Sequence, residues 1–384
     1  MSKQAYKFRL YPTRKQRERL QETLDRCREL YNAALQERRD AYRMCGITIT
    51  YYDQANQLPE IKKIREEYQD IHSQVLQDVL RRVDKAYTAF FRRFKHGEKP
   101  GYPRFQGYHR YGSFTYPQAG FSLTHESRIT LSKIGSIKVK LHRAIRGMIK
   151  TCTIKREGTH WYVVFVCEVQ PEPLPESKEA VGIDLGLLHL ATLSTGETIE
   201  NPRYLRQAEK KLQRLQQELS RKQRGSKRRR KAVKRIVKTH RKVRNQRRDF
   251  LHKASRKLVD QYGLIVFEKL QPANMSKRPK PKQDEHGAYV PNGAAAKGGL
   301  NKSILDAGWA MFQQFCVYKA ECAARTVLFV NPRYTSQICS GCGAIKKKTL
   351  DERWHSCECG TELDRDHNSA ITILALGRSV QVQT

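Results

Sequence analysis

Two short apolar segments set the strongest limits on the fold of this chain. Residues 181–186 read VGIDLG and residues 264–268 read LIVFE, so each has the length of one buried strand and each contains a single carboxylate. A lone carboxylate is costly to bury, so packing alone explains Glu268 poorly. Asp184 stands just before a turn that contains Gly186, and simple turn chemistry is the alternative for that residue. We therefore expect strand ends that bring Asp184 and Glu268 toward one place.

The segments around these two strands follow the order of a ribonuclease H-like domain. The predicted series is strand 181–186, strand 189–194, strand 197–200, two basic helices, strand 264–268, helix 301–324 and strand 327–330. A last apolar helix opens with LDRDHNSA from Leu363, and either Asp364 or Asp366 occupies the position of a helix cap.

Asp366 completes a set of three acids with Asp184 and Glu268. Carboxylate oxygens are the ligands that Mg²⁺ prefers, and two such ions ~4 Å apart activate a water molecule and stabilise the leaving oxygen in phosphodiester hydrolysis. The three acids together predict such a site more specifically than any one of them. Capping of the last helix is the alternative for Asp366.

The charge of the chain is large and unevenly placed. Its 384 residues include 74 Lys and Arg against 38 Asp and Glu, for a formal charge of +36. Half of that charge lies in residues 210–248, which hold 19 Lys or Arg and the single acid Glu218. Apolar residues at three- and four-residue steps predict two long helices there, joined near Gly225, with one stripe packed on the body. Because so many like charges repel each other, we expect a nucleic acid to neutralise them.

Other features exclude several classes of protein. The apolar windows are shorter than the roughly 20 residues that a membrane span needs, and residues 1–12 lack the apolar core of a secretory signal. Full disorder is excluded as well, because 39% hydrophobic residues suffice to bury a core.

Four of the ten cysteines have the spacing of a zinc site. Cys339 and Cys342 form a Cys-x2-Cys pair, and after fourteen intervening residues Cys357 and Cys359 form a Cys-x-Cys pair. Glycines within and after the pairs permit the tight turns that place four thiolates around one tetrahedral ion. The zinc is expected to be structural, because all four positions are filled. The short second pair leaves His355 as an alternative ligand, and disulfides are the alternative chemistry.

The N-terminal 170 residues have a different pattern. Residues 5–11 are a predicted strand, Thr13 and Gln16 form a capping box, and a second helix is predicted over 73–94. Residues 98–170 mix aromatics with Arg, Gly and Pro and include a predicted hairpin, so they are β-rich. Five aromatics in this region are candidates either for core packing or for stacking on bases: Tyr102, Phe105, Tyr108, Tyr111 and Phe114.

Five motifs, in this order, resemble the TnpB family of transposon-encoded RNA-guided DNA endonucleases, which is related to the type V CRISPR effectors. They are YKFRLYPT, GIDLG, VFEKL, YTSQICSGCG and DRDHNSA, and the resemblance covers nearly the whole chain. It implies an α+β multidomain protein with a RuvC-like, RNase H-like nuclease domain, an inserted zinc ribbon, a β-barrel-like wedge domain and an α-helical recognition domain. The implied boundaries are wedge 1–11 and 98–170, recognition 12–97, linker 171–178, nuclease 179–335 and 361–384, and a zinc-binding, target-nucleic-acid-binding module 336–360.

The resemblance also implies partners and site residues. Asp184, Glu268 and Asp366 would ligate catalytic Mg²⁺, and the four cysteines would ligate Zn²⁺. The guide RNA would derive from the transposon end, and the protein would read a short motif beside the double-stranded DNA target and leave the target sequence to base pairing. The expected location is the prokaryotic cytoplasm, on the nucleoid when bound to DNA, and the oligomeric state stays open.

Two groups of side chains are candidates for nucleic-acid contacts. The first group lies in the basic helices and would meet RNA phosphates: Arg228, Arg229, Arg230, Arg235 and Lys238. The second group would read the base edges of the adjacent motif, with core packing or ordinary surface as the alternative: Gln77, Tyr116 and Gln118.

Three other functions share parts of this pattern. A nuclease-inactive, RNA-guided DNA-binding repressor would keep everything except the acids. A strand-transfer transposase also uses an acid triad on a ribonuclease H-like domain. An RNA-binding protein without activity would have the charge and the zinc module, but it would not need Asp184 and Glu268 at strand ends.

Overall fold

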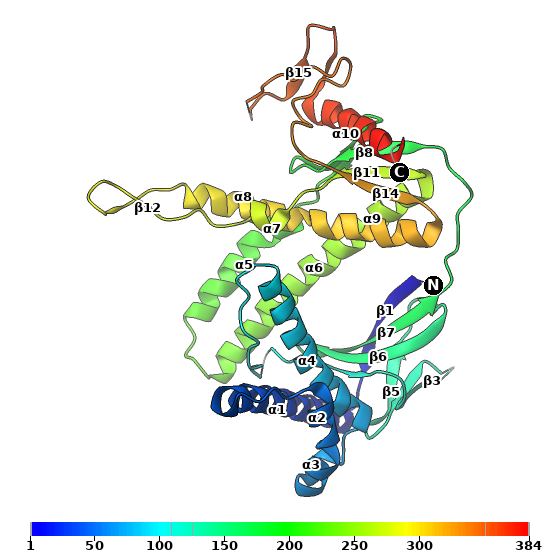
Figure 1. Cartoon of the computed structure of the whole chain (residues 1–384), viewed down its shortest axis with the longest axis vertical. Coiled ribbons are helices and arrows are strands. Elements are labelled where there is room, and N and C mark those ends of the chain that lie inside the picture. The colour runs from blue at the N-terminus through cyan, green and yellow to red at the C-terminus, as the bar shows by residue number, and fades with distance from the viewer. Residues whose placement is uncertain (1, 109, 125, 350, 383–384) are drawn as a thin grey trace. The chain divides into compact units, whose positions relative to one another are not determined.

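The computed structural model describes residues 2–108, 110–124, 126–349 and 351–382. The chain divides into two compact units, Met1–Gln170 and Pro171–Thr384, and each has its own hydrophobic core (Figure 1). The predicted linker at 171–178 begins at the boundary between these units. In the described ranges, no helix is long and apolar enough to cross a membrane.

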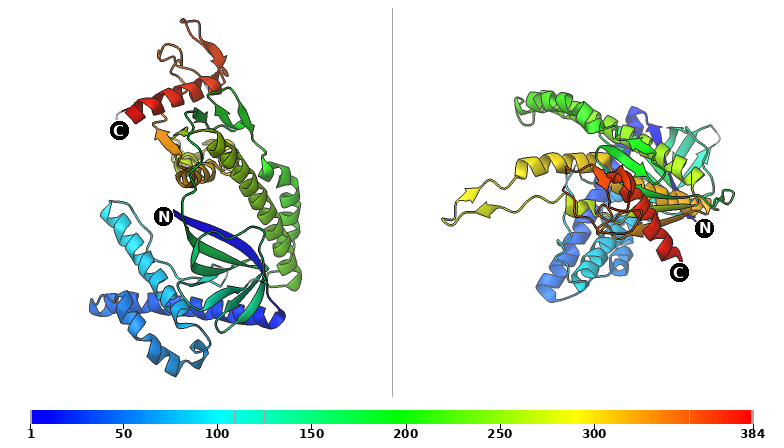
Figure 2. Two further views of the ribbon diagram at one scale, coloured as in Figure 1. Left: turned by 90° about the vertical axis from the view of Figure 1, so that its right-hand side faces the viewer. Right: turned by 90° about the horizontal axis from the view of Figure 1, so that it is seen from above.

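The N-terminal unit is built on one antiparallel sheet. Its strands are β1 Ser2–Tyr11, β2 Ser113–Tyr116, β3 Phe121–Thr124, β4 Arg128–Leu131, β5 Gly135–Lys140, β6 Met148–Glu157 and β7 His160–Val169. The order β2-β6-β7-β1-β5-β4-β3 places β2 and β3 at opposite edges, yet only residues 117–120 separate them in sequence. So short a link requires the sheet to curl until its edges approach, as Figure 2 shows. The predicted β-barrel-like architecture is confirmed.

The helices of this unit pack on the sheet and share its core. They are α1 Arg14–Cys45, α2 Tyr51–Asn56, α3 Leu58–Ile64, the 3-10 helix Glu66–Tyr68 and α4 Ser73–Lys95. The capping box that the sequence predicts at Thr13 and Gln16 starts α1, and the left-handed Gly46 ends it. One core joins these helices to the strands, so the structure forms one compact unit where the sequence separates a wedge from a recognition domain.

The sheet of the C-terminal unit has ribonuclease H-like topology. Its strands are β8 Ala180–Asp184, β9 His189–Leu193, β10 Thr198–Glu200, β11 Leu264–Glu268 and β14 Thr326–Val330. Their order is β10-β9-β8-β11-β14, in which β8, β11 and β14 are parallel and β9 and β10 are antiparallel additions. Every residue of β11 is buried, because helices cover both faces of the sheet there.

Helix α10, Arg365–Val382, lies directly on β8 and β11 because two glycines make room for it. A Cβ on Gly182 of β8 would lie 2.1 Å from the carbonyl oxygen of Ala370. A Cβ on Gly377 of α10 would lie 2.5 Å from a methyl group of Val266 on β11. Any larger side chain at either glycine would push the helix away from the strands.

In the sequence, the remaining elements of this unit lie between the strands of the sheet or between β14 and α10. They are α5 Tyr204–Ser220, α6 Lys227–Gln261, α7 Pro272–Met275, β12 Lys282–Gln283, β13 Tyr289–Val290, α8 Ala294–Ala307, α9 Trp309–Ala323, β15 Trp354–Ser356 and β16 Glu362–Asp364. The two basic helices are joined near Gly225 as predicted, and this glycine has a φ of +84°.

Two details of the helix predictions are wrong. The single helix expected over residues 301–324 is divided at Gly308, whose φ of +75° ends α8 before α9 begins. Val233 and Val237 of α6 belong to the stripe expected to pack on the body, yet both are exposed. The buried residues of α6 lie mainly in its C-terminal half, where α9 covers the helix.

Candidate functional site

Asp184 and Glu268 end neighbouring parallel strands. β8 and β11 pair with Ile183 opposite Phe267, so the next residues along, Asp184 and Glu268, lie side by side. Side chains alternate between the two faces of a sheet, so each acid shares a face with the residue two positions earlier. Those residues, Gly182 and Val266, are the ones that contact α10. Both carboxylates therefore lie on the face that α10 covers.

Helix α10 carries the third acid to the same place. Ala370 packs on Gly182, and Asp366 precedes Ala370 by one helical turn. That turn advances ~6 Å, which matches the ~6.6 Å from Gly182 to Asp184 along the strand. A Cβ on Gly186 would lie 3.9 Å from Asp366 Oδ2, so Asp366 reaches the glycine turn that follows Asp184.

Asp364, not Asp366, caps this helix. The Oδ1 atom of Asp364 accepts hydrogen bonds from the backbone N–H groups of Asp366 at 2.9 Å and His367 at 3.2 Å. These bonds satisfy two of the donors that every helix start leaves unpaired. The capping alternative for Asp366 is therefore taken up by its neighbour.

Burial raises the pKa of all three acids, and neighbouring negative charge adds to the effect at Asp184 and Asp366. Burial is the main reason that the pKa of Asp184 lies well above its ordinary value, and the charges of Glu268 and Asp366 raise it further. Burial also raises the pKa of Glu268 and of Asp366, and for Asp366 the charge of Asp364 adds to the effect. Buried carboxylates that repel each other are suited to bind a divalent cation, which supplies the opposing charge.

Two buried polar side chains hold Glu268 in place, and the sequence analysis missed both. The hydroxyl of Thr335 donates a hydrogen bond to Glu268 Oε1, and Gln313 Nε2 donates to the Glu268 carbonyl oxygen at 3.0 Å. Thr335 belongs to the YTSQICSGCG motif, which the sequence analysis used only for its cysteines. Since the hydroxyl partner lies 67 residues away in the chain, local pattern alone does not reveal the contact.

The four predicted cysteines form a cluster that fits zinc. Their sulfur atoms all lie within 4.8 Å of one another, and the pairs Cys339–Cys359 and Cys342–Cys357 are each separated by 3.6 Å. Zinc–sulfur bonds of ~2.3 Å in a tetrahedron place sulfur atoms ~3.8 Å apart, whereas a disulfide requires ~2.05 Å. The spacing therefore matches four thiolate ligands of one structural ion and excludes disulfides between these pairs.

His355 stands beside this cluster and does not belong to it. Its side chain is fully buried, and its Nδ1 atom is hydrogen-bonded to Lys348 Nζ. Burial alone would raise the pKa of the Cys339 thiol, but hydrogen bonds from His355 and from backbone amides outweigh burial and lower that pKa to about 5. His355 thus favours the thiolate form of a cysteine that a metal ion requires.

Asn368 connects the cysteine module to the helix of the third acid. Its side chain is fully buried, accepts a hydrogen bond from Ser340 N at 2.9 Å and donates one to Ile338 O at 2.8 Å. The same helix therefore fixes the first cysteine turn and presents Asp366. The sequence analysis did not assign a role to this residue.

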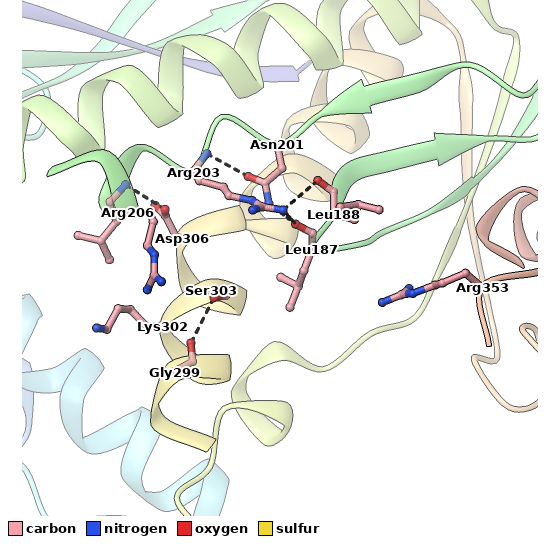
Figure 3. Close-up of a pocket in the computed structure, with 11 residues that line it drawn as sticks. Leu187, Leu188, Asn201, Arg203, Arg206, Gly299, Lys302, Ser303, Asp306 and Arg353 are labelled. Carbon is pink, nitrogen blue, oxygen red and sulfur yellow. Dashed lines mark hydrogen bonds between the residues drawn. The ribbon is translucent and has the colours of Figure 1, made fainter. Parts of the chain in front are cut away.

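A cavity of about 440 Å³, lined in part by Leu187 and Leu188 of the loop that follows Asp184, has four cations among its lining residues (Figure 3). Arg203, Arg206, Lys302 and Arg353 contribute positive charge, and Asp306 is the acid among the lining residues. Arg353 comes from the cysteine module, and its charge lowers the pKa of Asp366, so it lies within electrostatic reach of that carboxylate. The cavity presents cations of the kind that hold a phosphate backbone.

Arg203, which lines this cavity, has a left-handed backbone and a side chain held by hydrogen bonds. Its φ of +49° is left-handed, and its guanidinium donates to the carbonyl oxygens of Leu187 at 3.2 Å and Leu188 at 3.5 Å. Asn201 supports it by donating to Leu187 O at 3.0 Å (Figure 3). Non-glycine residues are uncommon in this conformation, and they cluster at functional sites.

Comparison with known proteins assigns the chain to a family. Residues 164–279 match a family model described as a probable transposase, residues 309–373 match the Cas12f1-like TNB domain, and residues 1–46 match a helix-turn-helix domain. Two relatives have the name "Putative RNA-guided DNA endonuclease". InsQ of Escherichia coli (strain K12) is 35% identical over 98% of this chain and 93% of its own length. The chain belongs to the TnpB family.

The second of these TnpB relatives is from Streptomyces pristinaespiralis. It is 31% identical over 98% of this chain and 89% of its own length. Among solved structures, the mini-RNA-guided endonuclease CRISPR-Cas_phi3 covers 97% of this chain at 10% identity, with a TM-score of 0.44. The residues that match the helix-turn-helix model form β1 followed by one continuous helix, α1, in this TnpB chain.

The structure separates the three residues predicted to read the adjacent motif. Gln118 is exposed in the link between β2 and β3, and Gln77 is half-buried on α4. Gln74, one turn before Gln77, accepts a hydrogen bond from Ala119 N at 3.0 Å. Gln77 and Gln118 therefore both lie near the N-terminal end of α4. Tyr116 is wrong as a surface contact, because it is buried and its hydroxyl donates to Ser132 O at 3.1 Å.

The predicted RNA contacts on the basic helices also fall into two classes. Arg228, Arg230 and Lys238 are exposed, as a phosphate contact requires. Arg229 instead donates to the carbonyl oxygens of Leu219 and Lys222 and closes the end of α5.

Arg235 combines features of both classes. It is exposed, and it pairs with Glu218 at 2.9 Å. Glu218 is the single acid of residues 210–248, so the ion pair neutralises one of the many charges and leaves the exposed cations unbalanced.

Proposed function

We propose that this chain is an RNA-guided DNA endonuclease whose nuclease site consists of Asp184, Glu268 and Asp366. The observation that carries the proposal is the meeting of three carboxylates with raised pKa values on one face of a ribonuclease H-like sheet. Membership of the TnpB family and the names of two full-length relatives support the guided activity.

The three acids would hold two Mg²⁺ ions. Bound there, magnesium supplies the charge that activates a water molecule and stabilises the leaving oxygen of a phosphodiester. Thr335 orients Glu268 by its hydrogen bond, and Asp364 occupies the helix cap so that the carboxylate of Asp366 stays available. The cations of the cavity beside the acids would position the DNA strand through its phosphates.

The rest of the chain would supply the guide and the target. Exposed cations of α5 and α6 would hold a guide RNA derived from the transposon end, and Gln77 and Gln118 would contact the short motif beside the double-stranded target. The zinc module would stabilise the segment that leads to Asp366. The protein would act in the prokaryotic cytoplasm, on the nucleoid while bound to DNA.

The test is cleavage of guide-matched double-stranded DNA by the purified chain with its RNA and Mg²⁺. We expect Asp184→Asn to lower the rate by at least about 1,000-fold, because loss of a metal ligand removes several kcal/mol of transition-state stabilisation. Glu60→Gln, an exposed acid on α3, is the matched control and should cleave normally. Undiminished cleavage by Asp184→Asn would contradict the assignment of this residue.

Sequencing the RNA that co-purifies with the chain separates the alternatives. One RNA species with a constant scaffold and a variable end supports a guided protein. Guided binding without cleavage by the wild-type chain would identify a repressor, and joining of DNA strands without RNA would identify a strand-transfer transposase.

A further inference from the structure

Five large aromatic side chains of the N-terminal unit lie in solvent near one another in sequence. Phe91 and Phe94 end α4, and Tyr102, Phe105 and Tyr108 follow in the connecting segment; each exposes between 43% and 68% of its surface. Single exposed apolar residues are ordinary, but contiguous ones mark a binding surface, and Phe91 and Tyr102 both contact the ring of Tyr87. We call these five residues the aromatic surface.

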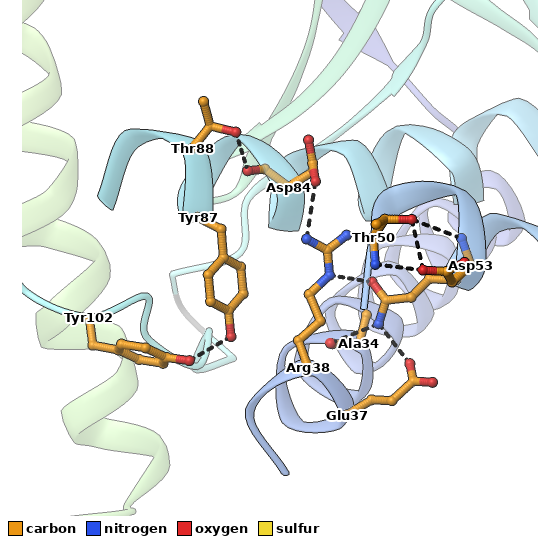
Figure 4. Close-up of polar contacts among 10 residues, drawn as sticks. Ala34, Glu37, Arg38, Thr50, Asp53, Asp84, Tyr87, Thr88 and Tyr102 are labelled. Atoms are coloured by element: carbon orange, nitrogen blue, oxygen red, sulfur yellow. Dashed lines mark hydrogen bonds and ion pairs between the residues drawn. The ribbon is translucent and has the colours of Figure 1, made fainter. Parts of the chain in front are cut away.

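Two rings of the aromatic surface, those of Phe91 and Tyr102, are held by other rings. Phe91 stacks on Tyr87 with centroids 6.2 Å apart, and Tyr102 packs edge-on against Tyr87 at 5.7 Å and against Phe90 at 5.4 Å. The hydroxyls of Tyr87 and Tyr102 share a hydrogen bond of 2.7 Å, which Figure 4 shows. Such edge-on and stacked contacts fix the ring orientations before any partner arrives.

Polar contacts hold Tyr87, the ring that contacts Phe91 and Tyr102, against the helices of the unit. The Arg38 guanidinium lies 5.6 Å from the Tyr87 ring centroid and is itself bonded to Gln54 at 2.8 Å and Asp84 at 3.1 Å (Figure 4). Because Arg38 holds Tyr87 in place, the neighbouring rings of Phe91 and Tyr102 keep a face exposed to solvent.

The connecting segment is anchored as well. Gln106 N donates to Asn32 Oδ1 at 2.8 Å, and Asn32 Nδ2 donates back to Gln106 O at 3.1 Å. Tyr108 has two guanidinium groups near its ring, Arg28 at 6.0 Å and Arg156 at 5.5 Å. The segment therefore presents fixed aromatic faces beside positive charge.

The charge around the aromatic surface decides between partners. Residues 85–110 contain seven Lys or Arg and one acid, Glu98. A second copy of the chain would bring another +36 to this face, so electrostatics oppose self-association. A nucleic acid brings phosphates for the cations, and its unpaired bases bring flat faces that stack on aromatic rings.

We propose that the aromatic surface binds unpaired bases of RNA. The inference rests on the proposed function, because the RNA is taken to be the guide, whose loops and ends are the places where bases are free to stack. Phe91 and Phe94 form the stacking contacts on α4, and the neighbouring cations bind the adjoining phosphates.

The test compares two double variants in binding to an unstructured oligouridine and to the co-purified RNA. Phe91→Leu with Phe94→Leu keeps apolar, helix-compatible side chains but removes the aromatic faces, whereas Phe91→Trp with Phe94→Trp retains them. We expect the leucine variant to bind oligouridine at least about tenfold more weakly, with the same dependence of affinity on salt, because every cation that binds a phosphate is retained. The tryptophan variant should bind like the wild-type chain.

Three results would overturn the inference. The first is equal RNA affinity for the leucine and wild-type chains. The second is an equal loss of affinity in both variants together with a lower melting temperature, which would mean that the face packs against protein. The third, measured with an oligodeoxythymidine of the same length, is a loss of affinity confined to single-stranded DNA. Normal cleavage by the leucine variant at unchanged RNA affinity would reject this inference alone. Failure of the wild-type chain to bind any RNA would reject the proposed function.

Discussion

At the scale of single residues, the acids depend on their neighbours: Thr335 donates a hydrogen bond to Glu268, and Asp364 caps the helix that carries Asp366. Glu268 was predicted because it stands alone in an apolar strand, and Asp184 because it ends another. The sequence leaves Asp364 and Asp366 as alternatives for the helix cap, and the structure distinguishes them, because Asp364 Oδ1 accepts hydrogen bonds from the backbone N–H groups of Asp366 and His367. Thr335 was not predictable, because its partner is set by the packing of distant segments.

The raised pKa of Asp184 predicts how the stability of the metal-free protein depends on pH. The folded state holds the Asp184 proton more tightly than the unfolded state, whose aspartate pKa is ~3.9. The stabilisation that comes from this tighter proton binding is complete below the unfolded pKa of ~3.9, and it is lost as the pH rises through the higher folded pKa. We therefore expect the free energy of unfolding of metal-free Asp184→Asn to exceed that of wild type increasingly from pH ~4 upward.

Urea unfolding at several pH values, with and without Mg²⁺, measures this effect. Mg²⁺ should stabilise the wild-type chain at neutral pH and leave Asp184→Asn unchanged, because the ion binds the ionised acids. Asp364→Asn is the matched control: the amide can still cap α10, so its stability should change by less than ~1 kcal/mol. Equal pH profiles for wild type and Asp184→Asn would mean that Asp184 is ionised without cost.

At the scale of elements, the hydrophobic pattern predicted the strands well and the helix ends less well. Residues 264–268 were predicted as a strand with the bounds that β11 has, because an apolar run of this length fits a buried strand. The helix over 301–324 was predicted as one piece because a single glycine inside a helical pattern is tolerated. The break at Gly308 follows from tertiary packing, since Arg247 and Leu251 crowd that position.

The cysteine module is the element whose stability we expect to depend on a ligand. We expect Cys342→Ser to release the zinc ion and to make residues 336–360 sensitive to protease, because four thiolates rather than a large core hold the segment together. Zinc content by elemental analysis and limited proteolysis measure the two effects. Cys45→Ser, an exposed cysteine of the N-terminal unit, is the control and should change neither. Full zinc content in Cys342→Ser would rule out the four-cysteine site.

At the scale of the whole molecule, the charge is the property that the sequence predicted most directly. The sequence gives +36 and places half of it in residues 210–248, most of which form α5 and α6. Composition does not show which of these cations are free, because that depends on how the two helices meet. Arg229 is occupied by the end of α5 and Arg235 by Glu218, whereas Arg228 and Arg230 remain exposed.

This difference between neighbouring arginines gives a prediction with an internal control. Neutralising Arg228 and Arg230 to Gln should weaken RNA binding and reduce the slope of log affinity against log salt, by about 0.7 for each phosphate that is no longer neutralised. Arg229→Gln should leave that slope unchanged and instead lower the melting temperature, because it releases the α5 carbonyls that Arg229 bonds. Filter binding over a range of salt and thermal unfolding measure the two properties. An unchanged slope for the Arg228 and Arg230 variant would place the RNA on another surface, since a protein of this charge that binds RNA must contact its phosphates through some set of exposed cations.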